Sequence, residues 1–180
     1  MIPHLAEEDR PPATLTIEEY YAQVWRPDCD FVDGRTEERN VGTFPHATLV
    51  SILSLMLSDK QTPYRFLPLP SLRIRVSPTR VRIPDVCLIE RSSPSEQVLT
   101  YPPLAVFEVL EEEDLASATL GKLDDFWRFG VVHIWVIDPA TRRVWAVDGA
   151  GLHLVQTGAL TVPGTPIRVL LSEMFDELDR

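Results

Sequence analysis

Two acidic side chains interrupt apolar segments of this sequence. Asp85 lies in the segment VRIPDVCLIE, residues 81–90, and Glu108 lies in LAVFEVL, residues 104–110. Both segments are typical of central strands that are covered on both faces of a sheet. A buried ionised carboxylate is costly unless it is paired, protonated or bound to a metal ion. The two acids therefore mark a candidate site rather than ordinary core positions.

Asp85 and Glu108 would repel each other at adjacent strand ends, and a divalent cation would turn that repulsion into coordination, since hard cations such as magnesium take oxygen ligands. Lys122 follows Glu108 by fourteen positions, on a predicted helix. A helix that follows a parallel strand can return a side chain to the carboxyl end of that strand. An ammonium group beside a metal and two carboxylates suits phosphoryl chemistry, because it can orient water and neutralise charge in the transition state.

Each of these residues also has a simpler interpretation. Asp85 follows a proline, and its carboxylate could cap a turn. Glu108 could form a structural pair with an arginine such as Arg75 or Arg82. Lys122, taken alone, is typical of an exposed lysine on a helix surface. The hypothesis of a metal site therefore depends on the combination of the three residues.

The elements that would position these residues can be predicted from capping and periodicity. A capping box at residues 16–19 predicts a short first helix. Apolar residues at helical spacing predict further helices over about 45–58 and 117–129. Alternating and continuous apolar segments predict several strands, with hairpins at Asp33-Gly34 and Asp148-Gly149 and a short closing helix. The fold class is therefore α/β or α+β, with a mixed sheet.

The composition is that of one globular domain. With 180 residues, 44% hydrophobic and 24% charged, we expect one domain over residues 14–180 after a flexible tail over residues 1–13. No apolar run could span a membrane, and residues 1–13 lack the pattern of a secretion signal. Cys29 and Cys87 are expected to be free thiols in a cytoplasmic protein.

The formal net charge of −10 argues against a broad surface that coats nucleic acid, because it repels polyanions at long range. A local basic cleft stays open as an alternative, since residues 65–91 contain six arginines and few acids. The simpler interpretation places these arginines on solvated strand faces. They are Arg65, Arg73, Arg75, Arg80, Arg82 and Arg91.

The same residues resemble a known nuclease signature. Pro84-Asp85 followed by Glu108-Val109-Leu110 is similar to the PD-(D/E)xK pattern of restriction-endonuclease-like nucleases. Within that superfamily the chain resembles the Uma family over roughly residues 14–147. The segments that carry this resemblance are LTIEEYY, DFVDG, PHATLVSIL, RIPDVCLI, LAVFEVL, GKLDDFWRFGVVHIWVIDP and VWAV. The resemblance implies a restriction-endonuclease-like fold, with a central mixed β-sheet flanked by helices.

The resemblance also implies a metal site. Asp85 and Glu108 would bind magnesium or manganese, and the backbone carbonyl of Val109 would join them. The lysine that the pattern usually has two places after the acid is absent, because that place is Leu110. In the Uma family this lysine has moved to the helix, where Lys122 occupies the matching position.

Two further positions match the family, and one segment departs from it. Glu38 is similar to an additional family acid and would be an auxiliary ligand with a catalytic role. His46 matches a histidine that opens a helix, and its role is not assigned. Relatives continue after the Glu-Val-Leu with a loop similar to Ser-Pro-Ser, whereas this chain has the acidic run Glu111–Asp114. These negative charges would attract a metal ion and repel phosphate. Alternatively, Glu111 would itself be a metal ligand.

The resemblance therefore implies a magnesium- or manganese-dependent endonuclease that hydrolyses phosphodiester bonds in nucleic acid, with DNA favoured over RNA. It also implies a homodimer, while the short apolar runs imply no membrane partner. The alternative is a catalytically silent module of the same fold that serves as a dimeric interaction or regulatory scaffold. The acidic run favours the alternative, whereas the surviving acids and lysine favour the enzyme. The apolar residues expected at the dimer contact are Val144, Trp145 and Val147.

Overall fold

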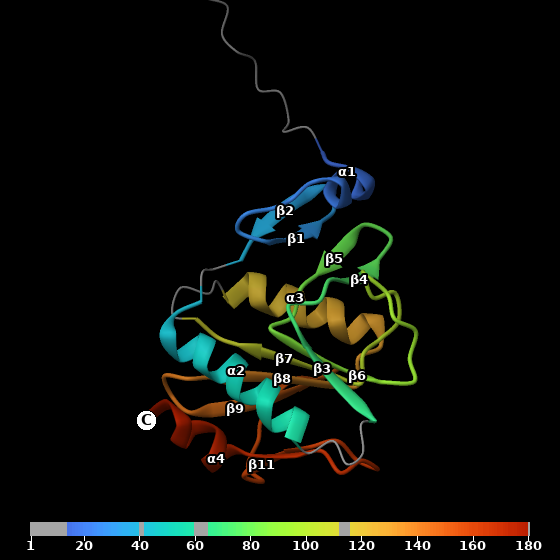
Figure 1. Ribbon diagram of the computed structural model, residues 1–180. Coiled ribbons are helices and arrows are strands. Elements are labelled where there is room, and N and C mark those ends of the chain that lie inside the picture. Colours follow the sequence, from blue (N-terminus) through green and yellow to red (C-terminus); the bar gives the residue numbers. More distant parts are fainter. Residues whose placement is uncertain (1–13, 40–41, 60–64, 112–115, 180) are drawn as a thin grey trace, which may run out of the picture.

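The computed structural model describes residues 14–39, 42–59, 65–111 and 116–179 (Figure 1). The predicted tail over residues 1–13 lies outside the described residues. The elements, in chain order, are α1 (Ile17–Ala22), β1 (Cys29–Val32), β2 (Arg35–Glu38), α2 (Phe44–Asp59), β3 (Phe66–Pro70), β4 (Ile74–Ser77), β5 (Arg80–Arg82), β6 (Val86–Glu90), β7 (Ala105–Val109), α3 (Ala116–Phe129), β8 (His133–Asp138), β9 (Arg143–Asp148), β10 (Gly151–Leu154), β11 (Ala159–Thr161), β12 (Arg168–Leu170), α4 (Leu171–Asp176) and a final 3-10 turn, Glu177–Asp179.

The strands form a large sheet, a smaller one and a short ribbon. The large sheet has the order β10-β9-β8-β7-β6-β3, and the smaller sheet has the order β2-β1-β5-β4. β7 and β8 run parallel, joined by α3, and the other neighbours in the large sheet are antiparallel. β11 and β12 pair as the ribbon. The predicted mixed sheet with flanking helices is confirmed.

The large sheet is covered on both faces. One face carries α2, α4 and the β11–β12 ribbon, with Leu53 and Phe107 in its core. The other face carries α3 and β4, with Leu123 and Phe126 packed against the sheet. In Figure 1, α3 lies between the large sheet and the smaller sheet, which contains the β1–β2 hairpin. Side chains of a strand alternate between faces, so Glu108 and Val106 of β7 point to the face that α3 covers.

The predicted helices are confirmed, and local signals explain their ends. Thr16 and Glu19 form both hydrogen bonds of a capping box at the start of α1. Gly130, at φ 104°, follows the last residue of α3, in the backbone region that favours glycine after a helix. The two predicted hairpins are also present, as β1–β2 and β9–β10. The turn of the β1–β2 hairpin consists of Asp33 at φ 49° and Gly34 at φ 88°.

The segment 81–90 does not form the single buried strand that its composition predicts. Its first residues belong to β5 in the smaller sheet, and its last residues form β6 in the large sheet. Residues 83–85 link the two sheets. Pro84 lacks an N–H for a ladder hydrogen bond, so it lies where neither sheet needs one. Asp85 therefore lies at the junction of the two sheets, directly before β6.

The expected subunit contact is wrong for Val144 and Val147. Their exposed fractions are 1% and 8%, and each belongs to a core cluster of the large sheet. Trp145 packs against the core on the α3 side. Cys29 and Cys87 are buried free thiols, as expected. Among the described helices, none has both the length and the apolar content needed to cross a membrane.

Candidate active site

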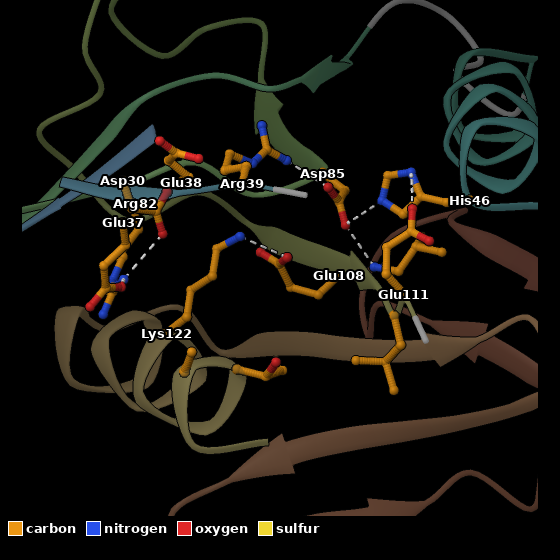
Figure 2. Close-up of a pocket in the computed structure, with 14 residues that line it drawn as sticks. Asp30, Glu37, Glu38, Arg39, His46, Arg82, Asp85, Glu108, Glu111 and Lys122 are labelled. Atoms are coloured by element: carbon orange, nitrogen blue, oxygen red, sulfur yellow. Dashed lines mark hydrogen bonds and ion pairs between the residues drawn. The ribbon is translucent and has the colours of Figure 1, made fainter. Parts of the chain in front are cut away.

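Asp85, Glu108 and Lys122 line one cavity of about 450 Å³ between the smaller sheet, the start of α2 and α3 (Figure 2). The register of β6 and β7 pairs Val86 with Phe107. Asp85 precedes the first of these residues and Glu108 follows the second, so antiparallel pairing brings the two acids side by side. The exposed fractions of Asp85 and Glu108 are 5% and 7%.

The carboxylate of Asp85 accepts hydrogen bonds from three directions. Arg39 Nη2 lies 2.6 Å from Oδ1, and the backbone N–H of Val109 donates to Oδ2 at 2.8 Å. His46 Nε2 lies 3.3 Å from the same Oδ2. Burial alone would raise the pKa of Asp85, but the hydrogen bond from His46 and the positive charges of Lys122 and Arg39 lower it to about 2. Asp85 is therefore an anion at neutral pH.

Glu108 has a different environment. Lys122 Nζ donates to its Oε2 at 2.8 Å, whereas Oε1 is buried without a hydrogen-bond partner among the described residues. Burial raises the pKa of Glu108 to about 8; the ammonium of Lys122 offsets part of the rise, and the negative charge of Asp85 adds to it. The pairing partner is thus Lys122, and the predicted alternative of a structural pair with Arg75 or Arg82 is wrong.

Lys122 is not an exposed helix lysine, since its side chain is 14% exposed. Burial would lower its pKa, but the negative charge of Glu108 leads to a net rise. The lysine therefore stays an ammonium group beside the two acids. The strand alternation of β7 and its crossover helix α3 place the strand acid and the helix lysine against each other, as the sequence predicts.

His46 connects Asp85 to the start of the acidic run. Its Nδ1 lies 3.7 Å from Glu111 Oε1. Thr43 donates its backbone N–H and its hydroxyl to the two oxygens of Glu111, at 2.8 Å each. A Cβ at position 42 would lie 2.8 Å from His46 Nδ1, so Gly42 allows this close approach. The other members of the acidic run, residues 112–114, lie outside the described residues.

Glu38 also lines the cavity, but its side chain is exposed. In the β1–β2 register Glu37 lies opposite Asp30, and Glu38 lies opposite Cys29. Because neighbouring residues of a strand face opposite sides, Glu37 rather than Glu38 shares the face of Asp30. The auxiliary role of Glu38 stays a prediction.

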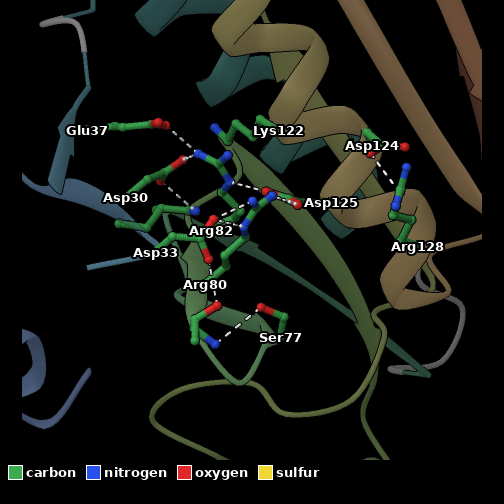
Figure 3. Close-up of polar contacts among 12 residues, drawn as sticks. Asp30, Asp33, Glu37, Ser77, Arg80, Arg82, Lys122, Asp124, Asp125 and Arg128 are labelled. Atoms are coloured by element: carbon green, nitrogen blue, oxygen red, sulfur yellow. Dashed lines mark hydrogen bonds and ion pairs between the residues drawn. The ribbon is translucent and has the colours of Figure 1, made fainter. Parts of the chain in front are cut away.

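A buried ionic network holds the hairpin against α3 (Figure 3). Arg82, which is 3% exposed, lies 3.1 Å from Asp30, 2.6 Å from Glu37 and 2.7 Å from Asp125 of α3. Arg80 bonds both Asp125 and the turn residue Asp33. Asp30 also accepts the backbone N–H of Ile83, at 2.9 Å. The network spans β1, β2, β5 and α3.

Three of the six arginines considered for a local basic cleft are already paired with acids. Arg73 pairs with Asp28 at 2.8 Å, and Arg80 and Arg82 pair with the acids of the network. The simpler interpretation, a solvated strand face, is wrong for Arg82. Six carboxylates line the cavity against three residues with a permanent positive charge, Arg39, Arg82 and Lys122. The cavity thus favours a cation.

The residues fit a divalent cation in one respect. A buried carboxylate oxygen without a partner, Glu108 Oε1, lies in a cavity beside a second carboxylate, and oxygen ligands of this kind suit magnesium or manganese. Among the described residues, however, no three acidic, histidine or cysteine side chains converge as ligands. Additional ligands would have to be backbone oxygen, as predicted for Val109, or water.

Residues 17–163 match the model of the Uma2 family, described as "Putative restriction endonuclease", and the chain belongs to this family. A solved structure of a putative nuclease belonging to DUF820 from Anabaena variabilis is similar at a TM-score of 0.79 and 13% identity. The match covers 91% of this chain and 99% of that one. At that identity the likeness establishes a shared fold. No curated protein matches the chain.

Sequence reasoning missed Arg39, and it named Arg82 without finding the acids that Arg82 pairs with. Arg82 offered a signal, since an arginine within the apolar segment 81–90 requires a buried acidic partner. Arg39 offered none, because it follows an exposed strand and reaches Asp85 across 46 positions of sequence.

Proposed function

We propose that this member of the Uma2 family is a metal-dependent endonuclease that hydrolyses phosphodiester bonds in nucleic acid, with DNA as the expected substrate. The supporting observation is the buried, unpartnered Oε1 of Glu108, which lies in one cavity with Asp85 and Lys122. Such an oxygen is costly unless a cation or proton completes it. Family membership supports a nuclease, and the cavity supplies the acids that a cation needs.

Asp85 and Glu108 would hold Mg²⁺ or Mn²⁺, with the carbonyl of Val109 and, as an auxiliary ligand, Glu38. When bound, the metal stabilises charge on a phosphoryl oxygen and lowers the pKa of a bound water. His46 and the N–H of Val109 hold the Asp85 carboxylate in orientation through Oδ2.

Lys122 is the residue proposed to act on the reacting atoms. Its ammonium is fixed by Glu108 at 2.8 Å within the cavity. From there it can orient the attacking water by donating a hydrogen bond to it. It can also offset the negative charge that develops on the phosphate in the transition state. Cleavage by a homodimer in the cytoplasm remains part of the proposal.

A second candidate is a catalytically silent interaction or regulatory module of the same fold. Two observations favour it. Both oxygens of Asp85 already accept hydrogen bonds, from Arg39 and from Val109. The excess of acids in the cavity also repels a phosphate backbone unless a cation is present.

The test is cleavage of plasmid and single-stranded DNA with Mg²⁺, Mn²⁺ or EDTA. We expect metal-dependent cleavage by the wild type and a loss of about 100-fold or more in Asp85→Asn and Lys122→Ala, the loss typical of removing one electrostatic or acid–base group. Asp124→Asn is the control, because Asp124 lies on α3 but forms an exposed pair with Arg128. Unchanged cleavage in both site variants contradicts the proposed site. The silent module is favoured if the wild type binds metal, Asp85→Asn does not, and the wild type cleaves no nucleic acid.

A further inference from the structure

Arg39 follows the last residue of β2 and reaches into the cavity. Its Nη2 lies 2.6 Å from Asp85 Oδ1, and its Nη1 lies 3.4 Å from Ser71 Oγ. Figure 2 shows the guanidinium beside the Asp85 carboxylate, on the side away from His46. The Arg39 side chain is 21% exposed, so solvent and a ligand in the cavity can reach it.

The three positive residues of the cavity differ in how firmly they are held. Arg82 is 4% exposed at its side chain and bonds three carboxylates. Lys122 is 14% exposed and bonds the buried Glu108. Among the described residues, Arg39 is the most exposed of the three and pairs with one carboxylate. The guanidinium of Arg39 can be solvated when it leaves, whereas Arg82 and Lys122 are more deeply buried. Arg39 is therefore the positive group of the three that can leave its partner at least cost.

A divalent cation on Asp85 would compete with this guanidinium. The cation and the guanidinium are both positive, and both bind the carboxylate of Asp85. Binding of one to this carboxylate therefore weakens binding of the other. A guanidinium that leaves Asp85 carries two parallel N–H donors that suit a phosphate group. The cavity, where acids outnumber positive residues, lacks another accessible group of that kind among the described residues.

We propose that Arg39 is the resident counter-ion of Asp85, that a divalent cation displaces it, and that the freed guanidinium binds a phosphate group of the nucleic acid. This role rests on the metal-dependent function proposed above and deepens it. It predicts that metal binding and phosphate binding reinforce each other through one side chain. It also explains how an acidic cavity accepts a polyanion only after the metal has bound.

The first test is calorimetric titration of Mn²⁺ into the wild type, Arg39→Met and Arg73→Met, without nucleic acid. Arg73 is the matched control: it pairs with one carboxylate at 2.8 Å, its side chain is 26% exposed, and it is not among the residues that line the cavity. Both variants lose one positive charge. We expect Arg39→Met to lower the Kd for Mn²⁺ about fivefold or more, the lower bound of typical coupling between sites, and Arg73→Met to leave it near the wild-type value.

The second test is fluorescence anisotropy of a labelled DNA oligonucleotide in Ca²⁺ and in EDTA, with the oligonucleotide verified intact on a gel. Ca²⁺ takes the same kind of oxygen ligands. We expect Ca²⁺ to increase the DNA affinity of the wild type and of Arg73→Met. In Arg39→Met that increase should be smaller by about fivefold or more, even though its metal affinity is higher.

The outcomes separate the two proposals. If the wild type binds Mn²⁺ and Arg39→Met binds it equally or more weakly, the counter-ion role is wrong and the metal site stands. If Arg39→Met keeps the full increase in DNA affinity, the phosphate-binding role is wrong. If none of the three proteins binds Mn²⁺, the metal-dependent function fails together with the role of Arg39.

Discussion

Burial and the neighbouring negative charge of Asp85 both raise the pKa of Glu108. The residue is enclosed beside Asp85, and its pKa rises from 4.5 to about 8 although Lys122 donates to it. Asp85, held by three donors, has a pKa of about 2. Two adjacent carboxyl groups thus differ widely in proton affinity, as in many acid–base sites. One is a permanent anion, and the other exchanges a proton near neutral pH.

This difference predicts a pH-dependent stability that depends on Glu108. Because the pKa of Glu108 is higher in the folded protein, the unfolded chain loses this proton at a lower pH than the folded protein does. The contribution of Glu108 to the free energy of unfolding is therefore fully present below pH 4.5 and is lost as the pH rises toward 8. Without metal, Glu108→Gln should therefore be increasingly more stable than the wild type between pH 5 and 8. The gain should reach on the order of a few kcal/mol, at about 1.4 kcal/mol per unit of pKa. Urea unfolding in EDTA measures it.

Glu18→Gln is the control for this measurement, because Glu18 is exposed in the first turn of α1. Its stability difference from the wild type, measured over the same pH range, is the baseline from which Glu108→Gln is expected to depart. A flat profile for Glu108→Gln would mean that the folded protein does not oppose the ionisation of Glu108.

At the scale of elements, the hairpin and α3 are joined through Arg82. Three acids from β1, β2 and α3 surround this one guanidinium. Glu38 is the last residue of the β1–β2 hairpin, and Arg39 follows it directly. Lys122 belongs to the same helix as Asp125. The network therefore sets the position of two sides of the cavity.

Replacing Arg82 tests this role. Removing one partner of a buried ionic group leaves the remaining charges unpaired, which typically costs about 3–5 kcal/mol. We expect Arg82→Met to lose stability of that order, with faster hydrogen exchange in the β1–β2 hairpin. Arg128→Met is the control: its pair with Asp124 is 76% exposed on the arginine side, so the loss should stay below about 0.5 kcal/mol. Similar losses in both variants would contradict a structural role of the network.

Elements were easier to predict than their assembly. Capping and periodicity are local signals, and they identified α1, α2 and α3 to within a residue or two. The neighbourhood of Asp85, Glu108 and Lys122 was also predictable, because a strand and its crossover helix return side chains to one edge. The division of residues 81–90 between two sheets was not, since an apolar segment does not specify its pairing partner. The contacts of Arg39 and Glu111 depend on the same long-range assembly.

At the scale of the whole molecule, the charge of −10 distinguishes this protein from basic nucleases. Proteins that neutralise six to ten phosphates lose about 10³–10⁵ in DNA affinity between 50 and 200 mM salt, because they release counterions. Here most of the arginines near the cavity are already paired with acids. Under the proposed function, DNA binding would therefore depend on few contacts.

We accordingly expect a weak salt dependence. In Ca²⁺, the DNA affinity should fall by less than about tenfold over that salt range, in contrast to the steeper loss for proteins with many phosphate contacts. Anisotropy titrations at several salt concentrations give the slope. A steep decrease would indicate an extended basic surface and would contradict the cavity as the main contact.

The link at residues 83–85 gives the site a mechanical property. Asp85 stands where the chain passes from the smaller sheet to the large one, whereas Glu108 and Lys122 both belong to the large sheet and its helix. The N–H of Val109 fastens Asp85 to β7 across this boundary. Because Val109 and Glu108 belong to the same strand, this hydrogen bond keeps the carboxylate of Asp85 beside that of Glu108. A segment that links two sheets thus has its acid fixed to the large sheet alone, so the pair of carboxylates is preserved even where the chain changes sheets.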